Sequence, residues 1–191
     1  MNIQELKQAL NAGAYDETFR TLYPGCWEGQ RERYLRIADA FAEHFSGEHA
    51  VELYSAPGRS EIGGNHTDHQ RGRVLAAAVT LDAVAVAAKN DRNVIRIYSE
   101  GHGEERINLE KLEIVPEEKG TTAALIRGIA ARFYELDLRY GGFDAYVSSD
   151  VLPGSGLSSS AAYEVLVGTI LSGLYNGGRA EPVLIANVGQ F

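Results

Sequence analysis

The sequence predicts a fold of class α+β, because helix and strand patterns both recur along its 191 residues. Apolar residues recur at helical spacing in segments 30–45 and 121–140, which predicts two amphipathic helices. Alternating apolar residues in segments 94–99 and 143–149 predict strands. The hydrophobic fraction is 45% and the charged fraction is 23%, as in an ordinary globular domain with a buried core.

The first half of the chain predicts helices followed by extended segments. Residues 1–25 have the pattern of short helical pieces, with Asn2 in the position of an N-cap. After the first amphipathic helix, residues 51–55 predict a short strand that ends at Pro57. The glycine- and histidine-rich segment 58–72 has no clear period, so we expect an irregular loop there.

The second half predicts strands and two further helices. The apolar run 74–88 contains Asp82 at its middle, which favours two strand pieces. Residues 100–120 are polar and contain glycines, which predicts a hairpin and a loop. One helix follows the serines near 160, and the last helix begins at Pro182, where proline is tolerated in the first turn. The apolar stripe of that last helix consists of Leu184, Ile185, Val188 and Phe191.

The charge and cysteine content exclude several classes of protein. With 18 basic and 26 acidic residues the net charge is −8, which disfavours nucleic acid and anionic membranes as partners. The single cysteine, Cys26, excludes an internal disulfide framework and a CxxC metal site. The N-terminus lacks the apolar core of a signal peptide, and the longest apolar stretch is too short to span a bilayer. We therefore expect a cytoplasmic protein.

The segment 154–160 is the first candidate for chemistry. It consists of Gly154, Ser155, Gly156, Leu157, Ser158, Ser159 and Ser160. Glycines let backbone N–H groups approach an anion, and the helix that follows offers unpaired N–H groups at its N-terminus. One serine would be enough to cap that helix, but three serines exceed this need, so we favour phosphate binding over a capped turn. It is not a Walker A loop, because no lysine lies in this part of the chain.

The loop around Arg59 is the second candidate. It contains three glycines and a dense set of polar groups, which include Arg59, Asn65, His66 and Asp68. Such density suits a site that recognises many hydroxyls, as a sugar requires, and Arg59 could hold a phosphate oxygen. Two alternatives rank below the sugar site. One is a polar turn that satisfies its own backbone, and the other is a metal site that uses His66, Asp68 and His69.

Together, about 90 residues apart, the two segments resemble the GHMP small-molecule kinases, and among them the galactokinases. The galactokinase signature GRxNxIGEHxDY is matched at Gly58, Arg59, His66 and Asp68, and the Pro-x-Gly-x-Gly-Leu-Ser-Ser-Ser-Ala motif at 153–161. Asn65 stands where the signature has Glu, and His69 stands where it has Tyr. A carboxamide donates as well as accepts hydrogen bonds, so the sugar hydroxyls read at Asn65 are expected to differ.

The resemblance implies the fold and its limits. It implies a ribosomal protein S5 domain 2-like fold, in which a mixed β-sheet packs on helices. Residues 1–191 would form the N-terminal GHMP kinase domain, with 1–25 as an N-terminal appendage. Family members continue for roughly as long again, so the C-terminal domain is expected to be absent from this chain.

The resemblance also implies the activity, which is transfer of a phosphoryl group from MgATP to the anomeric hydroxyl of galactose. Segment 154–160 would bind the ATP phosphates and Ser160 would be the Mg²⁺ ligand. Arg59 would stabilise the transferring phosphoryl group and contact the substrate, together with Asn65, His66 and Asp68. The catalytic aspartate would lie beyond Phe191, so this chain alone is expected to be inactive. It is also expected to self-associate through an exposed apolar stripe on its last helix.

Three alternatives to a galactokinase remain open. One is a GHMP kinase for another sugar or small polyol. Another is a non-catalytic galactose and ATP sensor, which the galactokinase family also contains. A metal-dependent hydrolase ranks third.

Overall fold

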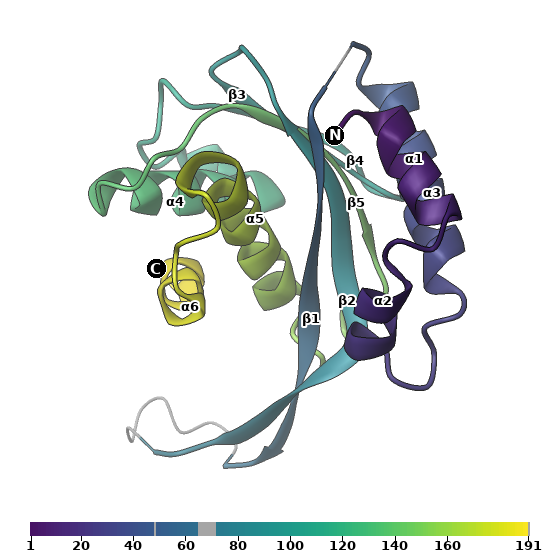
Figure 1. Ribbon diagram of the computed structural model, residues 1–191. Coiled ribbons are helices and arrows are strands. Elements are labelled where there is room, and N and C mark those ends of the chain that lie inside the picture. Colours follow the sequence, from purple (N-terminus) through teal and green to yellow (C-terminus); the bar gives the residue numbers. More distant parts are fainter. Residues whose placement is uncertain (48, 65–71, 191) are drawn as a thin grey trace.

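The computed structural model describes residues 1–190 except 48 and 65–71, and its centre is a five-stranded sheet between two layers of helices (Figure 1). The strands lie in the order β1-β2-β5-β3-β4. Strand β3 is parallel to β5, and the other neighbouring strands are antiparallel. The bounds are β1 (Val51–Gly63), β2 (Leu75–Lys89), β3 (Val94–Ser99), β4 (Gly103–Asn108) and β5 (Phe143–Ser149). The predicted mixed sheet packed on helices is confirmed.

Helices α1 (Ile3–Asn11), α2 (Asp16–Leu22) and α3 (Gln30–His44) cover one face of the sheet (Figure 1). Asn2 caps α1 as predicted, since its side chain accepts a hydrogen bond from the Glu5 N–H at 2.9 Å. The apolar core on this face includes side chains from α1, α2, α3 and the sheet, among them Leu6, Leu10, Phe19, Tyr23, Ile37, Phe41, Val84 and Val86. The first two helices therefore pack into this core.

Helices α4 (Thr122–Glu135), α5 (Ser159–Asn176) and α6 (Pro182–Gln190) cover the other face, and the short 3₁₀ helix η2 (Pro116–Glu118) precedes α4. The expectation of an exposed apolar stripe on α6 was wrong. Ile185 and Val188 are only 5% and 3% exposed, because they complete the core formed with α4 and α5. Leu184 is half-buried, and Phe191 lies outside the described residues.

The strand that contains Pro57 is longer than predicted, and this changes the site. β1 continues through Pro57 to Gly63, because β1 is an edge strand and proline needs no partner on its open side. The β1–β2 register shifts between Pro57, which pairs with Asp82, and Arg59, which pairs with Ala78, so the irregularity of the ladder lies directly before Arg59. Arg59 therefore lies on a strand and not in an irregular loop.

The two predicted strand pieces in 74–88 are one continuous strand, β2, with Asp82 buried at its middle. Helix α4 ends at Glu135, earlier than predicted. The chain turns soon afterwards, where Asp137 has a left-handed backbone with φ of 55°.

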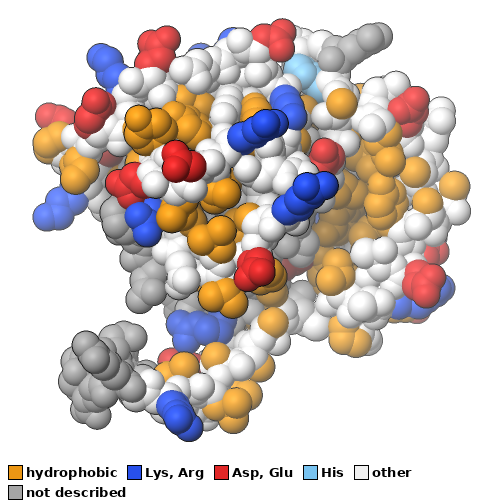
Figure 2. Space-filling view, turned by 60° about the vertical axis from the view of Figure 1, so that its left-hand side comes forward, with side chains coloured by type: hydrophobic (Ala, Val, Ile, Leu, Met, Phe, Trp, Pro, Cys, Tyr) orange, Lys and Arg blue, Asp and Glu red, His pale blue; other side chains and the backbone are white. Residues whose placement is uncertain are grey.

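The outer half of the β1–β2 hairpin projects from the body of the molecule and carries exposed apolar side chains (Figure 2). These include Ile62, Val74, Leu75 and Leu81. None of the described helices has both the length and the apolar character needed to cross a membrane.

Candidate functional site

The structure brings the two segments singled out in the sequence into contact. The Arg59 side chain donates a hydrogen bond from Nη2 to Ser158 Oγ at 2.7 Å. The Arg59 backbone N–H donates to the Leu157 carbonyl oxygen at 3.0 Å. The projecting edge strand and the loop after β5 therefore form a single site.

The backbone of the loop departs from ordinary conformations at three alternate residues. Gly154, Gly156 and Ser158 have φ values of 78°, 77° and 59°. Glycine adopts this left-handed region freely, whereas a serine there is uncommon and strained. Strained residues cluster at functional sites, and turns of this kind form concave sets of N–H groups that bind anions. The backbone thus favours the phosphate-binding interpretation of the segment.

The serines of the loop do not act as ordinary helix caps. Ser158 occupies the N-cap position of α5 but makes no side-chain capping bond, and its hydroxyl accepts from Arg59. The first N–H groups of a helix have no partner within the helix. The Ser159 and Ser160 side chains, in the first turn of α5, line an adjoining cavity. The N-terminus of α5 therefore keeps donors available for an anion.

Gly58 allows the close approach of β1 to the loop. A Cβ atom built on Gly58 would lie 3.1 Å from Val151 Cγ2 and 3.2 Å from the Leu157 carbonyl oxygen. These distances are shorter than ordinary van der Waals contacts. Any larger residue would push the loop away from the strand that carries Arg59.

A cavity of about 390 Å³ adjoins the loop. Ser159 and Ser160 line it together with apolar and polar side chains from β3, the β3–β4 turn, β5 and α4. Tyr163 of α5 also lines it, and burial raises the pKa of its hydroxyl to about 12, so this group stays neutral. The other lining residues are Ser99, Glu100, His102, Thr122, Leu125, Val147, Ser149, Val151, Leu152 and Pro153. The sequence did not single out Glu100, His102 or Tyr163, because each is isolated along the chain.

Glu61 is a second charged group beside Arg59 that sequence reasoning missed. Its Oε2 lies 3.2 Å from Arg59 Nη1, and its Oε1 is buried without a hydrogen-bond partner among the described residues. The Glu61 carboxylate stands where the galactokinase signature has Asn. It therefore offsets part of the charge of Arg59 and leaves one acceptor unsatisfied.

The remaining predicted sugar contacts, Asn65, His66 and Asp68, lie outside the described residues, and so does His69 of the alternative metal site. Across the described ranges, no group of three His, Cys, Asp or Glu side chains is placed to hold a metal ion. The sugar and metal interpretations of that segment both stay predictions.

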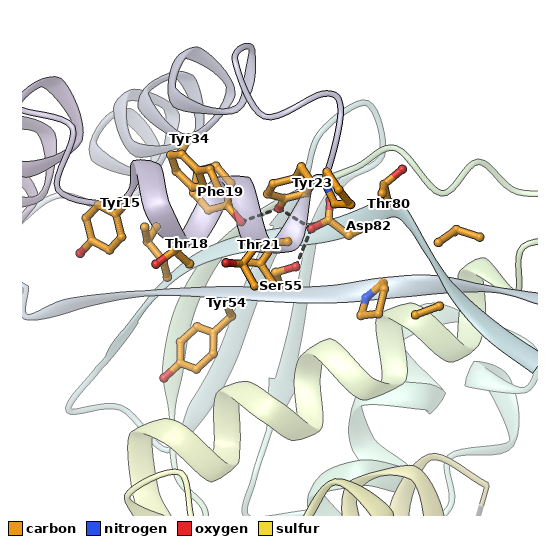
Figure 3. Close-up of a pocket in the computed structure, with 16 residues that line it drawn as sticks. Tyr15, Thr18, Phe19, Thr21, Tyr23, Tyr34, Tyr54, Ser55, Thr80 and Asp82 are labelled. Carbon is orange, nitrogen blue, oxygen red and sulfur yellow. Dashed lines mark hydrogen bonds between the residues drawn. The ribbon is translucent and has the colours of Figure 1, made fainter.

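A second cavity, of about 570 Å³, lies between α2 and the β1–β2 hairpin (Figure 3). Tyrosine and hydroxyl side chains line it, with Asp82 at its edge. The polar groups bond to one another: Tyr23 Oη donates to Asp82 Oδ2 at 2.6 Å and lies 2.8 Å from Tyr34 Oη. Because these groups satisfy one another, we assign no ligand to this cavity.

Both segments that form the site match models of known protein families. Residues 39–89 match the galactokinase galactose-binding signature, and residues 124–190 match the GHMP kinases N-terminal domain. By these matches the chain resembles the galactokinase branch of the GHMP kinases. Arg59 lies in the first matched segment and the 154–160 loop in the second.

Individual relatives agree with this resemblance. The chain is 32% identical over 155 residues to a galactokinase of Lacticaseibacillus casei (strain BL23), a match that covers 80% of this chain and 39% of the relative. The structure of Lactococcus lactis galactokinase complexed with galactose superposes with a TM-score of 0.72 at 28% identity, over 80% of this chain and 39% of that one. Methanococcus jannaschii mevalonate kinase shares the fold, with a TM-score of 0.59 at 20% identity over 76% and 46% of the two chains. The chain thus spans 39% of the length of the curated galactokinases that it matches.

Proposed function

We propose that this chain is the N-terminal part of a longer sugar kinase, here called the parent protein. The parent protein transfers the γ-phosphoryl group of MgATP to the anomeric hydroxyl of galactose. The observation that carries the proposal is the hydrogen bond of 2.7 Å between Arg59 Nη2 and Ser158 Oγ. It joins the segment that matches the galactose-binding signature to the segment that matches the kinase domain.

The residues of the loop fit the phosphates of ATP. The space around the Cα atoms of Gly154 and Gly156 is open, so a phosphate can approach the backbone there. The cavity of about 390 Å³ beside Ser159 and Ser160 has both apolar and polar walls, which suits a nucleoside. Bound MgATP supplies the phosphoryl group and a divalent charge. The Ser160 hydroxyl would hold the Mg²⁺, which prefers oxygen ligands.

Catalysis of phosphoryl transfer is mainly positioning and stabilisation of charge. In the proposed mechanism, Arg59 stabilises the transferring phosphoryl group, and its bond to Ser158 orients the guanidinium toward the loop. Asn65, His66 and Asp68 bind the sugar hydroxyls. By the resemblance to the family, the rest of the parent protein supplies the aspartate base.

One observation favours a second candidate, a GHMP kinase for another sugar or small polyol. Glu61 replaces the Asn of the signature, and its Oε1 is buried beside Arg59 without a hydrogen-bond partner among the residues that the structure describes. Asn65 and His69 replace two further signature residues. A changed set of donors and acceptors selects a changed pattern of hydroxyls.

The proposed partners are therefore a sugar and ATP. The net charge of −8 supports the proposal that neither nucleic acid nor an anionic membrane is a partner. We also propose a cytoplasmic location, because a chain with one cysteine is compatible with a reducing compartment.

A panel of sugars tests the proposal. The parent protein is mixed with MgATP and each sugar in turn, and the release of ADP is measured. We expect galactose to give the highest kcat/KM. A higher value for another sugar or polyol supports the second candidate. No stimulation by any sugar contradicts the kinase proposal and leaves a galactose and ATP sensor.

A further inference from the structure

We propose that Arg33 is a positioning residue of this site, which fixes where β5 leaves the sheet and thereby holds the 154–160 loop against Arg59. The effect of Arg33 on catalysis rests on the proposed function. Its effect on the loop does not, because that effect follows from contacts within the chain.

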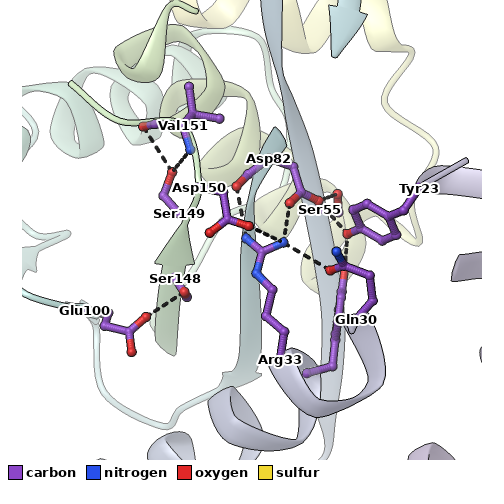
Figure 4. A network of polar contacts seen from close by, with 11 residues as sticks. Tyr23, Gln30, Arg33, Ser55, Asp82, Glu100, Ser148, Ser149, Asp150 and Val151 are labelled. Atoms are coloured by element: carbon purple, nitrogen blue, oxygen red, sulfur yellow. Dashed lines mark hydrogen bonds and ion pairs between the residues drawn. The ribbon is translucent and has the colours of Figure 1, made fainter. Parts of the chain in front are cut away.

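Arg33 binds Asp82 through two different groups. It lies in the first turn of α3, and its side chain is only 9% exposed. Its Nη1 donates to Asp82 Oδ1 at 2.6 Å, and its Nη2 donates to the Asp82 carbonyl oxygen at 3.1 Å (Figure 4). One guanidinium therefore holds both the side chain and the backbone of the central residue of β2.

The Asp82 carbonyl oxygen and the Arg33 guanidinium also bind Asp150, at the start of the loop. The Asp82 carbonyl oxygen also accepts the Asp150 N–H at 2.9 Å, and the Asp150 carboxylate lies 3.2 Å from Arg33 Nη1. Asp150 directly follows Ser149, which forms the last β2–β5 pair with Ala83. Arg33 thus binds the point at which β5 ends and the chain turns toward the loop.

Asp82 also restrains the strand that carries Arg59. It pairs with Pro57 in β1, directly before the register shift that precedes Arg59. The hydroxyls of Ser55 and Tyr23 donate to Asp82 Oδ2, and this ties β1 and the end of α2 to the same carboxylate. Arg33 and Asp82 therefore contact the residues that lead into both halves of the site. These are Asp150, which precedes the 154–160 loop, and Pro57, which precedes Arg59.

The chain offers a matched ion pair that lacks these contacts. Arg96 Nε donates to Asp144 Oδ1 at 2.8 Å, and Asp144 is fully buried. This pair lies near the start of β5, where Asp144 pairs with Ala88, whereas Asp150 follows the end of that strand. Among the described residues, this buried Arg–Asp pair makes no hydrogen bond or ion pair with Arg59 or with the 154–160 loop.

Amide hydrogen exchange on the 191-residue chain tests the proposal without any assay of activity. The variants are Arg33→Lys and, as the control, Arg96→Lys. A lysine keeps the charge but cannot bond two groups in the fork geometry of a guanidinium. We expect exchange at the Asp150 and Arg59 amides to become at least ~10-fold faster in Arg33→Lys, the effect of losing one charge-assisted hydrogen bond. The Arg96→Lys variant leaves those amides unchanged once exchange is corrected for global stability.

Equal exchange at the two amides in both variants, after that correction, overturns the proposal. If Arg33→Lys does not fold, Asp150→Asn replaces it, since this change keeps the Arg33–Asp82 pair and weakens only the contact at the start of the loop. Unchanged exchange at the Arg59 amide in Asp150→Asn also overturns the proposal. In the parent protein, Arg33→Lys is expected to lower kcat roughly 10-fold with little change in the KM for the sugar. If the parent protein phosphorylates no sugar, the proposed function fails while the exchange result stands.

Discussion

Arg59 and Ser158 form the contact on which the site depends, and its removal gives the first prediction. In the parent protein, Arg59→Ala is expected to lower kcat about 10³-fold, since an arginine that stabilises the transferring phosphoryl group contributes at least this much. The Arg59 side chain is 49% exposed, so stability should change by less than about 0.5 kcal/mol. Arg106→Ala, which removes an exposed arginine from β4, is the control and should leave kcat unchanged. Equal activity in the two variants would mean that Arg59 takes no part in the reaction.

Gly58 gives the second prediction at the scale of single residues. Gly58→Ala places a methyl group 3.1 Å from Val151 Cγ2, and the overpacking should cost about 1–3 kcal/mol of unfolding free energy. Gly128→Ala is the matched control, since that glycine lies within α4 with open space around it. The control should stabilise the chain by roughly 0.5–1 kcal/mol. Urea unfolding of the 191-residue chain measures both, and a stabilised Gly58→Ala would show that the strand and the loop do not pack as described.

At the scale of elements, the burial of α6 gives a stability prediction. It is the opposite of what an exposed stripe on this helix, expected from the sequence alone, would give. Ile185→Ala should cost about 2–5 kcal/mol, because the side chain fills the core between α4, α5 and α6. Val183→Ala on the same helix should change stability by less than about 0.5 kcal/mol, because Val183 is 69% exposed. Thermal or urea unfolding compares the two. Equal small effects would mean that the stripe of α6 is exposed, as the sequence analysis expected.

The helices and strands also show how much of the fold could be predicted from the sequence. Strand β5 and the whole of α3 were predicted because each has its own apolar period, which is a local property. The continuity of β2 was not predictable, because the buried Asp82 is tolerated there through distant partners such as Arg33, which lies 49 residues away along the chain. The continuation of β1 through Pro57 depends on its place at the edge of the sheet, which local sequence does not reveal.

The candidate site, too, was predicted from the sequence only in part. Glycines and serines in the 154–160 loop, and Arg59, carry recognisable patterns, so both segments were found from the sequence. Their contact was not found, because it joins residues 99 positions apart. Glu61 and Arg33 were missed because a single charged residue in a strand or helix has no distinctive pattern. The unexpected acid in the apolar run 74–88 was the one signal of a buried network.

At the scale of the whole molecule, buried tyrosines predict a loss of stability in alkali. Burial raises the pKa of Tyr34 and of Tyr163 to about 12, above the ordinary value of 10.0. A raised pKa means that the folded state binds the proton more tightly than the unfolded state. This contribution to stability is therefore complete below pH 10 and is lost as the pH rises toward 12.

The measurement is the free energy of unfolding in urea between pH 9 and 12, for the wild type and for Tyr163→Phe. The Tyr163→Phe variant lacks one tyrosine hydroxyl with a raised pKa, so its stability should fall less steeply above pH 10. Tyr134→Phe, at an exposed position, is the control and should keep the slope of the wild type. Identical slopes in all three proteins would contradict the assignment of a buried, neutral hydroxyl at Tyr163.

We propose above that Arg59 and the 154–160 loop form one site for phosphoryl transfer to galactose. Phosphorus NMR of the parent protein with galactose and MgATP tests it most directly, because it identifies the product as well as its rate of formation. We expect a resonance of galactose 1-phosphate that grows as ADP appears, and none when the 191-residue chain replaces the parent protein. Phosphate on another hydroxyl, or ATP that remains intact in the presence of the parent protein and galactose, would contradict it.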